Sequence, residues 1–508
     1  MIPTTHLLRI LTMKFKSKIL VYGIDKPFFQ DKFEFINKKY DNISCYASWS
    51  PIKKDLTISK LDRIDISLLF DQENIFNAYP LKKKAVLDKN FLSEMYECES
   101  VFLSTIDRCS AKSNSLNKTK NYFNDLLIFF KSFFESRVDI DYVFFQTTPH
   151  FPVGVVLFFV AKYFSKHTII LNRVGFNNKF YFKSDWRKAH DFNHDFNYIS
   201  DGKLDSEVLK SDSKFITTAR EENDYSIKNF KKNDNLLKII FDYIILLKLS
   251  FSFFKTRHTI SPFHLNKDIN GITIFSLLIK RYRQNKRLVK YYGSIMEKAT
   301  LNVEYVFFPL HFQPERSTDP EGSVFSNQLR AIELLRESLH PSIYIYVKEH
   351  PRQFDSHGFI DLRKIHARTE SFYERICSLP YTKLIDIGFD SNLLIKKAKI
   401  IATITGSSGW EAILQKKPTL VFGNPWYCSF NKCYIVEKKA DIIKALIEIN
   451  TSDFNIENME IRNFVDKLEG KIFDGYIGEM YHDGKLPYKK IIESFSSNLI
   501  IYLKNLQI

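Results

Sequence analysis

Short apolar runs alternate with helix-length segments along most of this chain, and this alternation restricts the fold more than any other feature. The runs in the first half are Lys18–Gly23, Ile66–Phe70, Ser100–Ser104, Asp141–Phe145 and Thr168–Leu171. Those in the second half are Glu304–Pro309, Ile343–Val347, Thr382–Asp386, Lys399–Thr403 and Pro418–Phe422. Helix-length segments between them include Asn121–Arg137, Val153–Ser165, Ser326–Ser338 and Glu411–Lys416. Such alternation is typical of parallel sheets with helices on both faces.

The alternation stops between residues 200 and 300, and this interruption divides the chain. With 508 residues, the chain is too long for one ordinary core. We predict an α/β fold with two Rossmann-like, doubly wound domains facing a cleft. The domains span residues 1–200 and 301–480, with a helical connecting region at 201–300 and a C-terminal helix at 481–508. Within the connection, the apolar segment 239–254 predicts a buried or interfacial helix, because it is shorter than a membrane span of roughly 20 residues.

The formal net charge of +16 favours phosphorylated ligands or an anionic membrane surface, unless it simply solvates the surface. We expect no nucleic-acid partner, because no recognisable nucleic-acid module accompanies the charge. The six cysteines form no CxxC pair, which suits a reducing compartment. Met1–Lys18 lacks the features of a signal peptide. We therefore expect a cytoplasmic protein, at most peripherally attached to a membrane.

A first polar motif, Pro309-Leu-His-Phe-Gln-Pro-Glu315, directly follows a predicted strand. The carboxyl ends of parallel strands are where such sheets bind ligands, so we expect His311, Gln313 and Glu315 at a site. Glu315 can receive a sugar hydroxyl or act as a general base, and His311 can bind phosphate or orient an acceptor. The alternative is that the motif only shapes a turn before the next helix.

A second motif, Lys348-Glu-His-Pro351, ends another predicted strand. Proline stops the strand and exposes His350, which can donate a hydrogen bond to a phosphate. Lys348 and Arg352 add positive charge, and an arginine can hold a phosphate with two hydrogen bonds. Taken alone, a capped surface histidine is the simpler interpretation.

The third motif is a small-residue turn, Thr405-Gly-Ser-Ser-Gly409, that opens into a helix-like segment. Gly406 permits a tight turn, while Thr405, Ser407 and Ser408 offer hydroxyls beside free helix amides. This combination predicts a phosphate cradle. We expect Glu411 in the first helical turn, where it contacts a ribose or sugar hydroxyl or only complements the helix dipole.

In this order, the three motifs and the later Lys417-Pro418 pair resemble the capsule polysaccharide biosynthesis family, whose members are GT-B-like glycosyltransferases and include Kdo transferases of capsule assembly. The resemblance covers about residues 300 to 430. The His-Pro and Ser-Ser elements also look like those of bacterial sialyltransferases, where they contact the CMP part of the donor.

The resemblance implies a nucleotide-sugar donor, CMP-linked with a Kdo- or sialic-acid-like sugar, bound by the domain at 301–480 through His350 and Ser407–Ser408. It implies a glycan or glycolipid acceptor on the domain at 1–200 and no tightly bound cofactor or metal. The positive charge favours a cytoplasmic location, at most peripheral on the cytoplasmic face of the inner membrane. The chain departs from the sialyltransferases in lacking their acidic triplet in the N-terminal half. Candidates for the acceptor side are Asp25, Asp71–Glu73, Asp107 and His150.

Two other functions remain open from the sequence. A teichoic-acid-type polyol-phosphate transferase also uses a GT-B fold with a His-Pro pair. A polysaccharide-export or scaffold protein would keep the fold without catalysis.

Overall fold

The computed structural model of the chain describes residues 17–25, 27–70, 75–81, 83–109, 115–175, 179–190, 192, 198, 243–248, 271–354, 367–451, 453–475 and 487–506. Asp71–Glu73, most of the N-terminal segment Met1–Lys18 and most of the predicted helix at 239–254 lie outside these residues.

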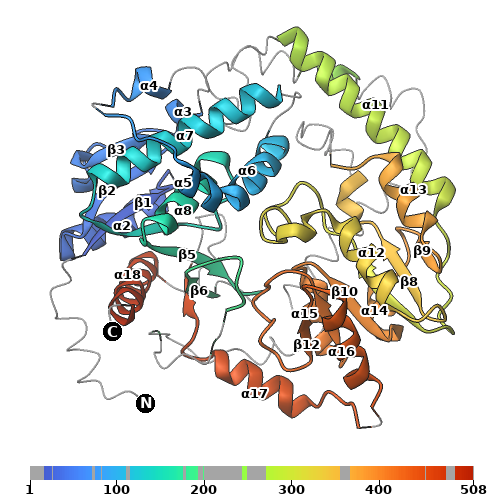
Figure 1. Cartoon of the computed structure of the whole chain (residues 1–508). Coiled ribbons are helices and arrows are strands. Elements are labelled where there is room, and N and C mark those ends of the chain that lie inside the picture. The colour runs from blue at the N-terminus through green and yellow to red at the C-terminus, as the bar shows by residue number, and fades with distance from the viewer. Residues whose placement is uncertain are drawn as a thin grey trace. The chain divides into compact units, whose positions relative to one another are not determined.

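The chain forms two compact units (Figure 1). Unit 1 comprises residues 1–103, 115–205 and 463–508, and unit 2 comprises residues 104–114 and 206–462. The C-terminal segment therefore returns to unit 1, whereas the sequence suggested a C-terminal domain through residue 480 and a separate helix after it. The division falls within helix α17 (Asn458–Leu468).

Unit 1 contains a seven-stranded sheet in the order β13-β6-β5-β4-β1-β2-β3. Five strands run parallel: β1 (Lys18–Tyr22), β2 (Ile43–Ser48), β3 (Asp62–Asp65), β4 (Ile140–Phe145) and β5 (His167–Arg173). Two short strands, β6 (Lys179–Lys183) and β13 (Phe473–Asp474), extend the edge in antiparallel pairs. The order of the five parallel strands reverses between β1 and β4, as in a Rossmann-type sheet.

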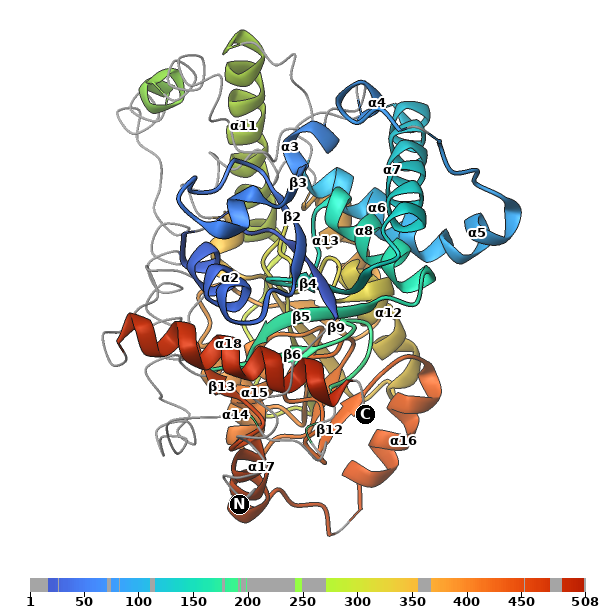
Figure 2. The same cartoon turned by 90° about the vertical axis from the view of Figure 1, so that its left-hand side faces the viewer.

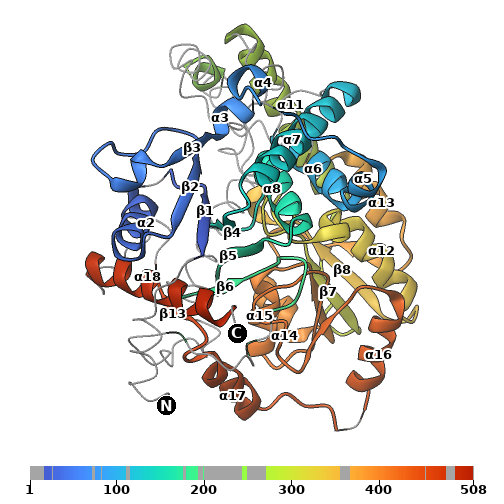
Figure 3. The ribbon, with the colours of Figure 1, turned by 60° about the vertical axis from the view of Figure 1, so that its left-hand side comes forward.

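Helices cover both faces of this sheet (Figure 3). Adjacent side chains of β4 point to opposite faces, because side chains alternate along a strand. Phe144 packs on Phe33 of α2 (Pro27–Tyr40) and on Phe495 of α18 (Tyr488–Asn505). Phe145 packs on Phe158 of α8 (Pro152–Tyr163), which lies beside α7 (Leu116–Ser136). Figure 2 shows α18 next to α2, so the end of the chain completes the core of unit 1.

Two predicted strands of unit 1 are wrong. The run Ile66–Phe70 forms the short helix α3 (Ile66–Leu69), which begins because the Asp65 carboxylate accepts a hydrogen bond from the Ser67 amide. The run Ser100–Ser104 lies inside helix α6 (Tyr96–Cys109). Its buried residues recur every four positions, at Cys98, Phe102 and Ile106, which is the helical period rather than the strand period. The remaining short helices of unit 1 are α4 (Ile75–Ala78) and α5 (Lys89–Glu94).

Unit 2 contains a fully parallel six-stranded sheet in the order β12-β11-β10-β7-β8-β9. The strands are β7 (Tyr305–Pro309), β8 (Tyr344–Lys348), β9 (Thr382–Leu384), β10 (Ile400–Thr403), β11 (Thr419–Val421) and β12 (Cys433–Ile435). The chain winds outward from β7 in both directions, so the strand order reverses between β7 and β10. Two α/β sheets of Rossmann type, one fully parallel and one with five parallel strands, confirm the predicted Rossmann-like fold class.

The alternation along β7 builds two cores on the two faces of this sheet. Val306 and Phe308 belong to a large cluster with α11 (Gly271–Ile295), α12 (Gln328–Ser338), α13 (Glu370–Ser378) and α16 (Lys439–Ile449). Tyr305 and Phe307 belong to a smaller cluster with α14 (Ser391–Lys397) and α15 (Ser407–Leu414). The sheet therefore has a fixed register, and the carboxyl ends of its strands emerge along one edge.

Candidate active site

The three sequence motifs meet in one cavity of about 350 Å³ at the carboxyl edge of the sheet in unit 2. They follow β7, β8 and β10, which are the strands beside the point where the strand order reverses. We call this the strand-end cavity, and its lining includes Pro309, His311, Phe312, Glu315, Ser317, Lys348, Glu349, His350, Ser391, Thr403, Thr405, Gly406, Ser407, Ser408 and Glu411. Nine of the sequence-predicted residues thus line one cavity: His311, Glu315, Lys348, His350, Thr405, Gly406, Ser407, Ser408 and Glu411.

The small-residue turn after β10 is shaped by the close approach of neighbouring groups. A Cβ on Gly406 would lie 2.8 Å from Thr403 Oγ1 and 3.2 Å from the His311 ring. A Cβ on Gly409 would lie 2.7 Å from Tyr427 Cζ, and the Tyr427 hydroxyl donates a hydrogen bond to the Gly406 carbonyl. Both glycines are therefore required by packing, and the turn is held against a buried tyrosine.

Helix α15 begins at Ser407, directly after the N-cap residue Gly406. Ser407 and Ser408 are consequently the first two helical residues, where backbone amides have no partner within the helix. Glu411 lies in the second turn, not in the first turn as expected, because the helix begins earlier than the sequence suggested. The Ser407 hydroxyl donates to Glu411 Oε1 at 3.3 Å. The start of α15 thus presents amides, hydroxyls and a positive dipole end to the cavity.

His311 is buried and its ring is held by the same turn. Thr405 N–H donates to His311 Nε2 at 3.3 Å, and Thr403 Oγ1 lies 3.0 Å from the same nitrogen. Because Nε2 accepts from an amide, the proton of the neutral ring is assigned to Nδ1. Burial, and secondarily the positive charge of Arg368, lower the pKa of His311 to about 4. The ring is therefore neutral at pH 7 and connects the first motif to the third.

His350 has the opposite arrangement of ring nitrogens. Arg352 N–H donates to His350 Nδ1 at 3.2 Å, so the proton of a neutral ring is assigned to Nε2. The ring is partly buried and lies 5.8 Å from the Phe312 ring, measured between centroids. His350 thereby offers an Nε2–H donor in a lining that also contains the amides of Ser407 and Ser408.

Lys348 is held by neighbouring groups rather than by solvent. Its Nζ donates to the Phe389 carbonyl at 2.7 Å and to Ser391 Oγ at 2.6 Å. Only 3% of its surface is exposed. Lys348 therefore fixes the loop before α14 and also places a positive charge at the wall of the cavity.

A buried ion pair beneath the two histidines has no counterpart in the sequence predictions. Glu349 Oε1 accepts from His350 N–H at 2.8 Å, and Arg368 donates to Glu349 Oε2 through Nε and to the His311 carbonyl through Nη2 at 3.0 Å. The Tyr373 hydroxyl donates to the same Glu349 oxygen at 2.7 Å. This network fixes both histidine-bearing loops. Of this pair, the sequence could have pointed only to Glu349, the charged residue directly before His350-Pro351. Arg368 lies in no recognisable motif.

Glu315 stands at the rim of the strand-end cavity. Burial of its carboxylate raises its pKa, while the hydrogen bond from Ser317 lowers it. The residue as a whole remains exposed, so solvent moderates the shift. A carboxylate with a raised pKa is suited to receiving a proton.

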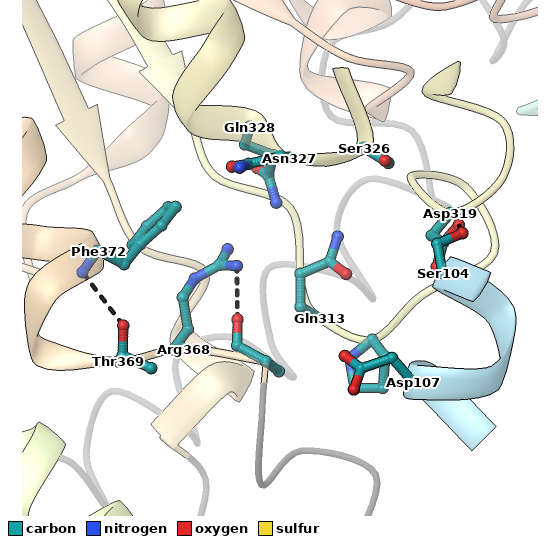
Figure 4. A pocket seen from close by; sticks show the side chains of 12 residues that line it. Ser104, Asp107, Gln313, Asp319, Ser326, Asn327, Gln328, Arg368, Thr369 and Phe372 are labelled. Carbon is teal, nitrogen blue, oxygen red and sulfur yellow. Dashed lines mark hydrogen bonds between the residues drawn. The ribbon is translucent and has the colours of Figure 1, made fainter. Parts of the chain in front are cut away.

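Two predicted residues lie elsewhere. Arg352 is exposed, with its guanidinium 5.9 Å from the Phe312 ring, and is not part of the cavity lining. Gln313 lines a second cavity of about 350 Å³ in unit 2, shown in Figure 4. Its Nε2 donates to Thr318 Oγ1, which turns the side chain away from the strand-end cavity.

The acceptor-side candidates Asp25 and His150 follow β1 and β4 of unit 1, beside the strand reversal of that sheet. Asp25 Oδ1 accepts from the Trp49 amide at 2.6 Å and the Ser50 amide at 3.2 Å, so it closes the turn after β2. Burial raises the pKa of Asp25 despite these hydrogen bonds. His150 Nδ1 lies 2.8 Å from the Thr148 carbonyl.

Neither metal-ligand clusters nor membrane-spanning helices occur in the described part of the chain. No group of three or more His, Cys, Asp or Glu residues there has the geometry to hold a metal ion. No described helix is long and apolar enough to cross a membrane. The five cysteines whose side chains are described form no disulfide with one another.

The fold and site define an α/β protein with a ligand cavity at the strand reversal of a Rossmann-type sheet. Residues 248–430 match the family model described as "Capsule polysaccharide biosynthesis protein". This match covers all three motifs and confirms the resemblance that their order suggested.

Comparison with curated proteins finds no match. Similar solved structures include KpsC of Thermosulfurimonas dismutans, described as a beta Kdo 2,7 transferase, with 10% identity, a TM-score of 0.29 and coverage of 77% of this chain and 91% of that one. Another KpsC structure of that organism, a beta Kdo 2,4 transferase, has 12% identity, a TM-score of 0.25 and coverage of 64% and 88%. The UDP-GlcNAc 2-epimerase of Methanocaldococcus jannaschii has 13% identity, a TM-score of 0.25 and coverage of 90% and 98%. These TM-scores are too low to bear on the activity of the chain.

Proposed function

We propose that this protein is a glycosyltransferase of capsular polysaccharide biosynthesis, which moves a sugar from a nucleotide donor to a growing glycan or glycolipid. The observation that carries the proposal is the strand-end cavity, where the start of α15, His350 and Glu315 share one lining. In this proposal the cavity binds the donor, and the nucleotide-sugar is a co-substrate rather than a resident cofactor.

The donor phosphate binds at the start of α15 in this proposal. The amides of Ser407 and Ser408, which have no helical partners, and the Ser408 hydroxyl are the kind of donors that hold phosphate oxygens, while the Ser407 hydroxyl donates to Glu411. His350 Nε2–H adds a donor from the neighbouring strand end. The positive end of the helix dipole further favours an anion at this position.

A donor with one phosphate, such as a CMP-linked sugar, suits the charges of the cavity better than a nucleoside diphosphate donor. Lys348 is the one Lys or Arg side chain among the described residues of the lining, and it already donates to Phe389 and Ser391. The same lining carries Glu315 and Glu411. A single phosphate charge needs less compensation than two, so we assign the donor as CMP-linked, with a Kdo- or sialic-acid-like sugar.

In the transfer, the bond between the anomeric carbon and the phosphate oxygen of the donor breaks, and a bond from the acceptor oxygen to that carbon forms. The acceptor hydroxyl loses its proton to a base, which we assign to Glu315 because its pKa is raised. CMP leaves with one more negative charge on its phosphate. His350 Nε2–H and the α15 amides bind that charge more strongly in the transition state than in the donor, and this difference accelerates the reaction.

The acceptor side is assigned to unit 1, with Asp25 and His150 as candidate contacts at the strand reversal of its sheet. The net charge of +16 supports peripheral attachment to an anionic membrane surface, where a glycolipid acceptor would reside.

The test is release of nucleotide from CMP-, UDP- and GDP-sugars, with and without capsular oligosaccharide acceptors. We expect turnover with a CMP-sugar, and a loss of roughly 10²- to 10³-fold in kcat for His350→Ala. His340→Ala is the matched control, because His340 is an exposed histidine in the loop before β8. It should leave kcat unchanged.

Absence of turnover and of binding for all three nucleotide classes would refute the enzyme and favour a scaffold or export protein. Release of CMP from CDP-glycerol with transfer of the polyol phosphate would instead establish the teichoic-acid-type reaction.

A further inference from the structure

The second cavity of unit 2 is built for a ligand that carries many hydroxyl groups. Its lining combines side-chain amides, hydroxyls, carboxylates and one aromatic ring: Gln313, Asn327, Gln328, Ser104, Ser326, Thr369, Asp107, Asp319 and Phe372, together with Arg368. We call it the amide-lined cavity. The lining residues from α6, Ser104 and Asp107, group with unit 2, and Ser104 Oγ donates to Asp319 Oδ1 at 2.7 Å.

Gln313 is the central group of this cavity, and only 9% of it is exposed. Thr318 Oγ1 donates to the Glu315 carbonyl at 3.1 Å and therefore must accept from Gln313 Nε2, which fixes the orientation of the amide. Gln313 Oε1 then has no partner among the described residues. In Figure 4 the side chains of Gln313, Asn327 and Arg368 point toward the same space. Because Gln313 lines the cavity, a ligand bound there can donate a hydrogen bond to this oxygen.

Asn327 and Asp107 add further unused hydrogen-bonding groups. Asn327 Oδ1 accepts from the Leu329 amide as the N-cap of α12, which leaves its Nδ2 without a described partner. Asp107 is exposed on α6, and no hydrogen bond joins its carboxylate to a described residue. These groups supply both donors and acceptors, as the hydroxyls of a sugar require.

The charges of the amide-lined cavity do not suit a phosphate. The guanidinium of Arg368 is already used by Glu349, the Ala367 carbonyl and the His311 carbonyl, and its charge is neutralised by Glu349. Asp107 and Asp319 leave the lining with excess negative charge. Phe372 offers an apolar surface of the kind on which the C–H face of a sugar ring packs.

The amide-lined cavity also shares its wall with the strand-end cavity. The His311 amide donates to Gln328 Oε1 at 2.8 Å, and the His311 carbonyl accepts from Arg368 Nη2, while the His311 ring lines the other cavity. Two ligand sites with a common wall suit an enzyme that handles more than one sugar.

We propose that the amide-lined cavity is a binding subsite for a neutral saccharide, namely a sugar residue of the glycan on which the protein acts. This proposal rests on the proposed function for the identity of the glycan, but binding to the subsite needs no donor. Its volume lies within the range of roughly 300–1,000 Å³ usual for small-molecule sites.

Saturation-transfer NMR on the full-length protein tests the subsite, with methyl glycosides of glucose, galactose and N-acetylglucosamine as probes. At least one should receive saturation, and both Asn327→Ser and Asp107→Ala should weaken its binding roughly five- to tenfold. Serine keeps the N-cap of α12. Asp466→Ala is the control for Asp107→Ala, because Asp466 is an exposed helical aspartate outside the cavity. Asp390→Ser is the control for Asn327→Ser, because Asp390 is also an N-cap residue, at the start of α14.

Addition of CMP separates this proposal from the proposed function. If CMP binds without displacing the glycoside, the two sites are distinct, as we propose. If CMP displaces the glycoside, or if the control variants weaken it equally, the sugar lies elsewhere and the subsite is refuted. If no neutral probe binds while CMP does, or if glucuronate binds more tightly than glucose, the subsite is refuted while the proposed function stands.

Discussion

Arg368 Nε lies 2.7 Å from Glu349 Oε2, and the two side chains are only 5% and 0% exposed. Arg368 also donates to the His311 carbonyl, while Glu349 accepts from the His350 amide. A single buried ion pair therefore joins the loops that carry both histidines of the strand-end cavity. Such a pair is costly to break, since the remaining charge has no partner.

Replacement of Glu349 by Gln should lower the free energy of unfolding by about 3–5 kcal/mol, because Arg368 is left buried with its charge uncompensated. Glu370→Gln is the matched control. It breaks the pair with Arg287, whose side chain is 75% exposed, and should cost far less, because solvent screens an exposed pair. Urea denaturation of both variants measures the difference, and equal losses would show that burial of the first pair does not matter.

Stability should fall as the pH drops from about 6.5 to about 4, because the pKa of His311 is lowered to about 4 in the folded chain. Between these two pH values the unfolded chain binds a proton that the folded chain does not, so acid favours unfolding. Above pH 6.5 His311 is neutral in both states, and its contribution to the free energy of unfolding no longer changes with pH. A difference of this size corresponds to about 3 kcal/mol. His311→Gln should flatten the pH dependence of urea unfolding, whereas His340→Gln should retain it. If the pH dependence of urea unfolding persists in His311→Gln, then groups other than His311 cause it.

Gly409→Ala should destabilise the protein by about 1–3 kcal/mol, because the new methyl group would overlap the buried Tyr427 ring. Gly293→Ala, within α11, should instead stabilise it by roughly 0.5–1 kcal/mol, since nothing lies within 4 Å of the added Cβ. Thermal unfolding of the two variants gives opposite shifts in Tm if the turn after β10 is packed as described. Shifts of the same sign would contradict that packing.

Glu315→Gln should lower kcat by roughly 10²- to 10⁴-fold and change KM little, because the amide keeps the shape of the side chain but accepts no proton. In the wild type, kcat should rise with pH through the raised pKa of Glu315, as the carboxyl becomes an active base. The variant should lose this limb of the pH profile, and Glu333→Gln, an exchange on α12, should not. A higher KM with unchanged kcat would instead assign Glu315 to binding a sugar hydroxyl.

The sequence predicted five of the six strands of unit 2, because each of these five is an apolar run that ends in polar residues, whereas the short β12 was not predicted. Val306 and Phe308 alternate with Tyr305 and Phe307 between two cores, so local pattern and burial agree. The prediction of a strand at Ser100–Ser104 was wrong. The short apolar run suggested a strand, but the buried residues Cys98, Phe102 and Ile106 have helical spacing. Strand β2, Ile43–Ser48, was missed because serines and small residues interrupt its apolar pattern, although it is largely buried between β1 and β3.

The sequence correctly predicted that His311, His350 and Ser407 lie in one site. Each follows a predicted strand, and the carboxyl ends of parallel strands lie along one edge of the sheet. The pattern did not reveal that Gln313 turns to another cavity or that Arg368 supports both histidines. Those positions depend on contacts between residues far apart in the chain, such as Arg368 with His311, and no local spacing encodes them.

The structure of the protein in complex with CMP is the most direct test of the proposed donor site. We predict the CMP phosphate within hydrogen-bonding distance of the Ser407 and Ser408 amides and of His350 Nε2, with the nucleotide in the strand-end cavity. CMP bound at any other position, or an empty strand-end cavity at CMP concentrations that saturate the protein in solution, would contradict the assignment of this cavity to the donor.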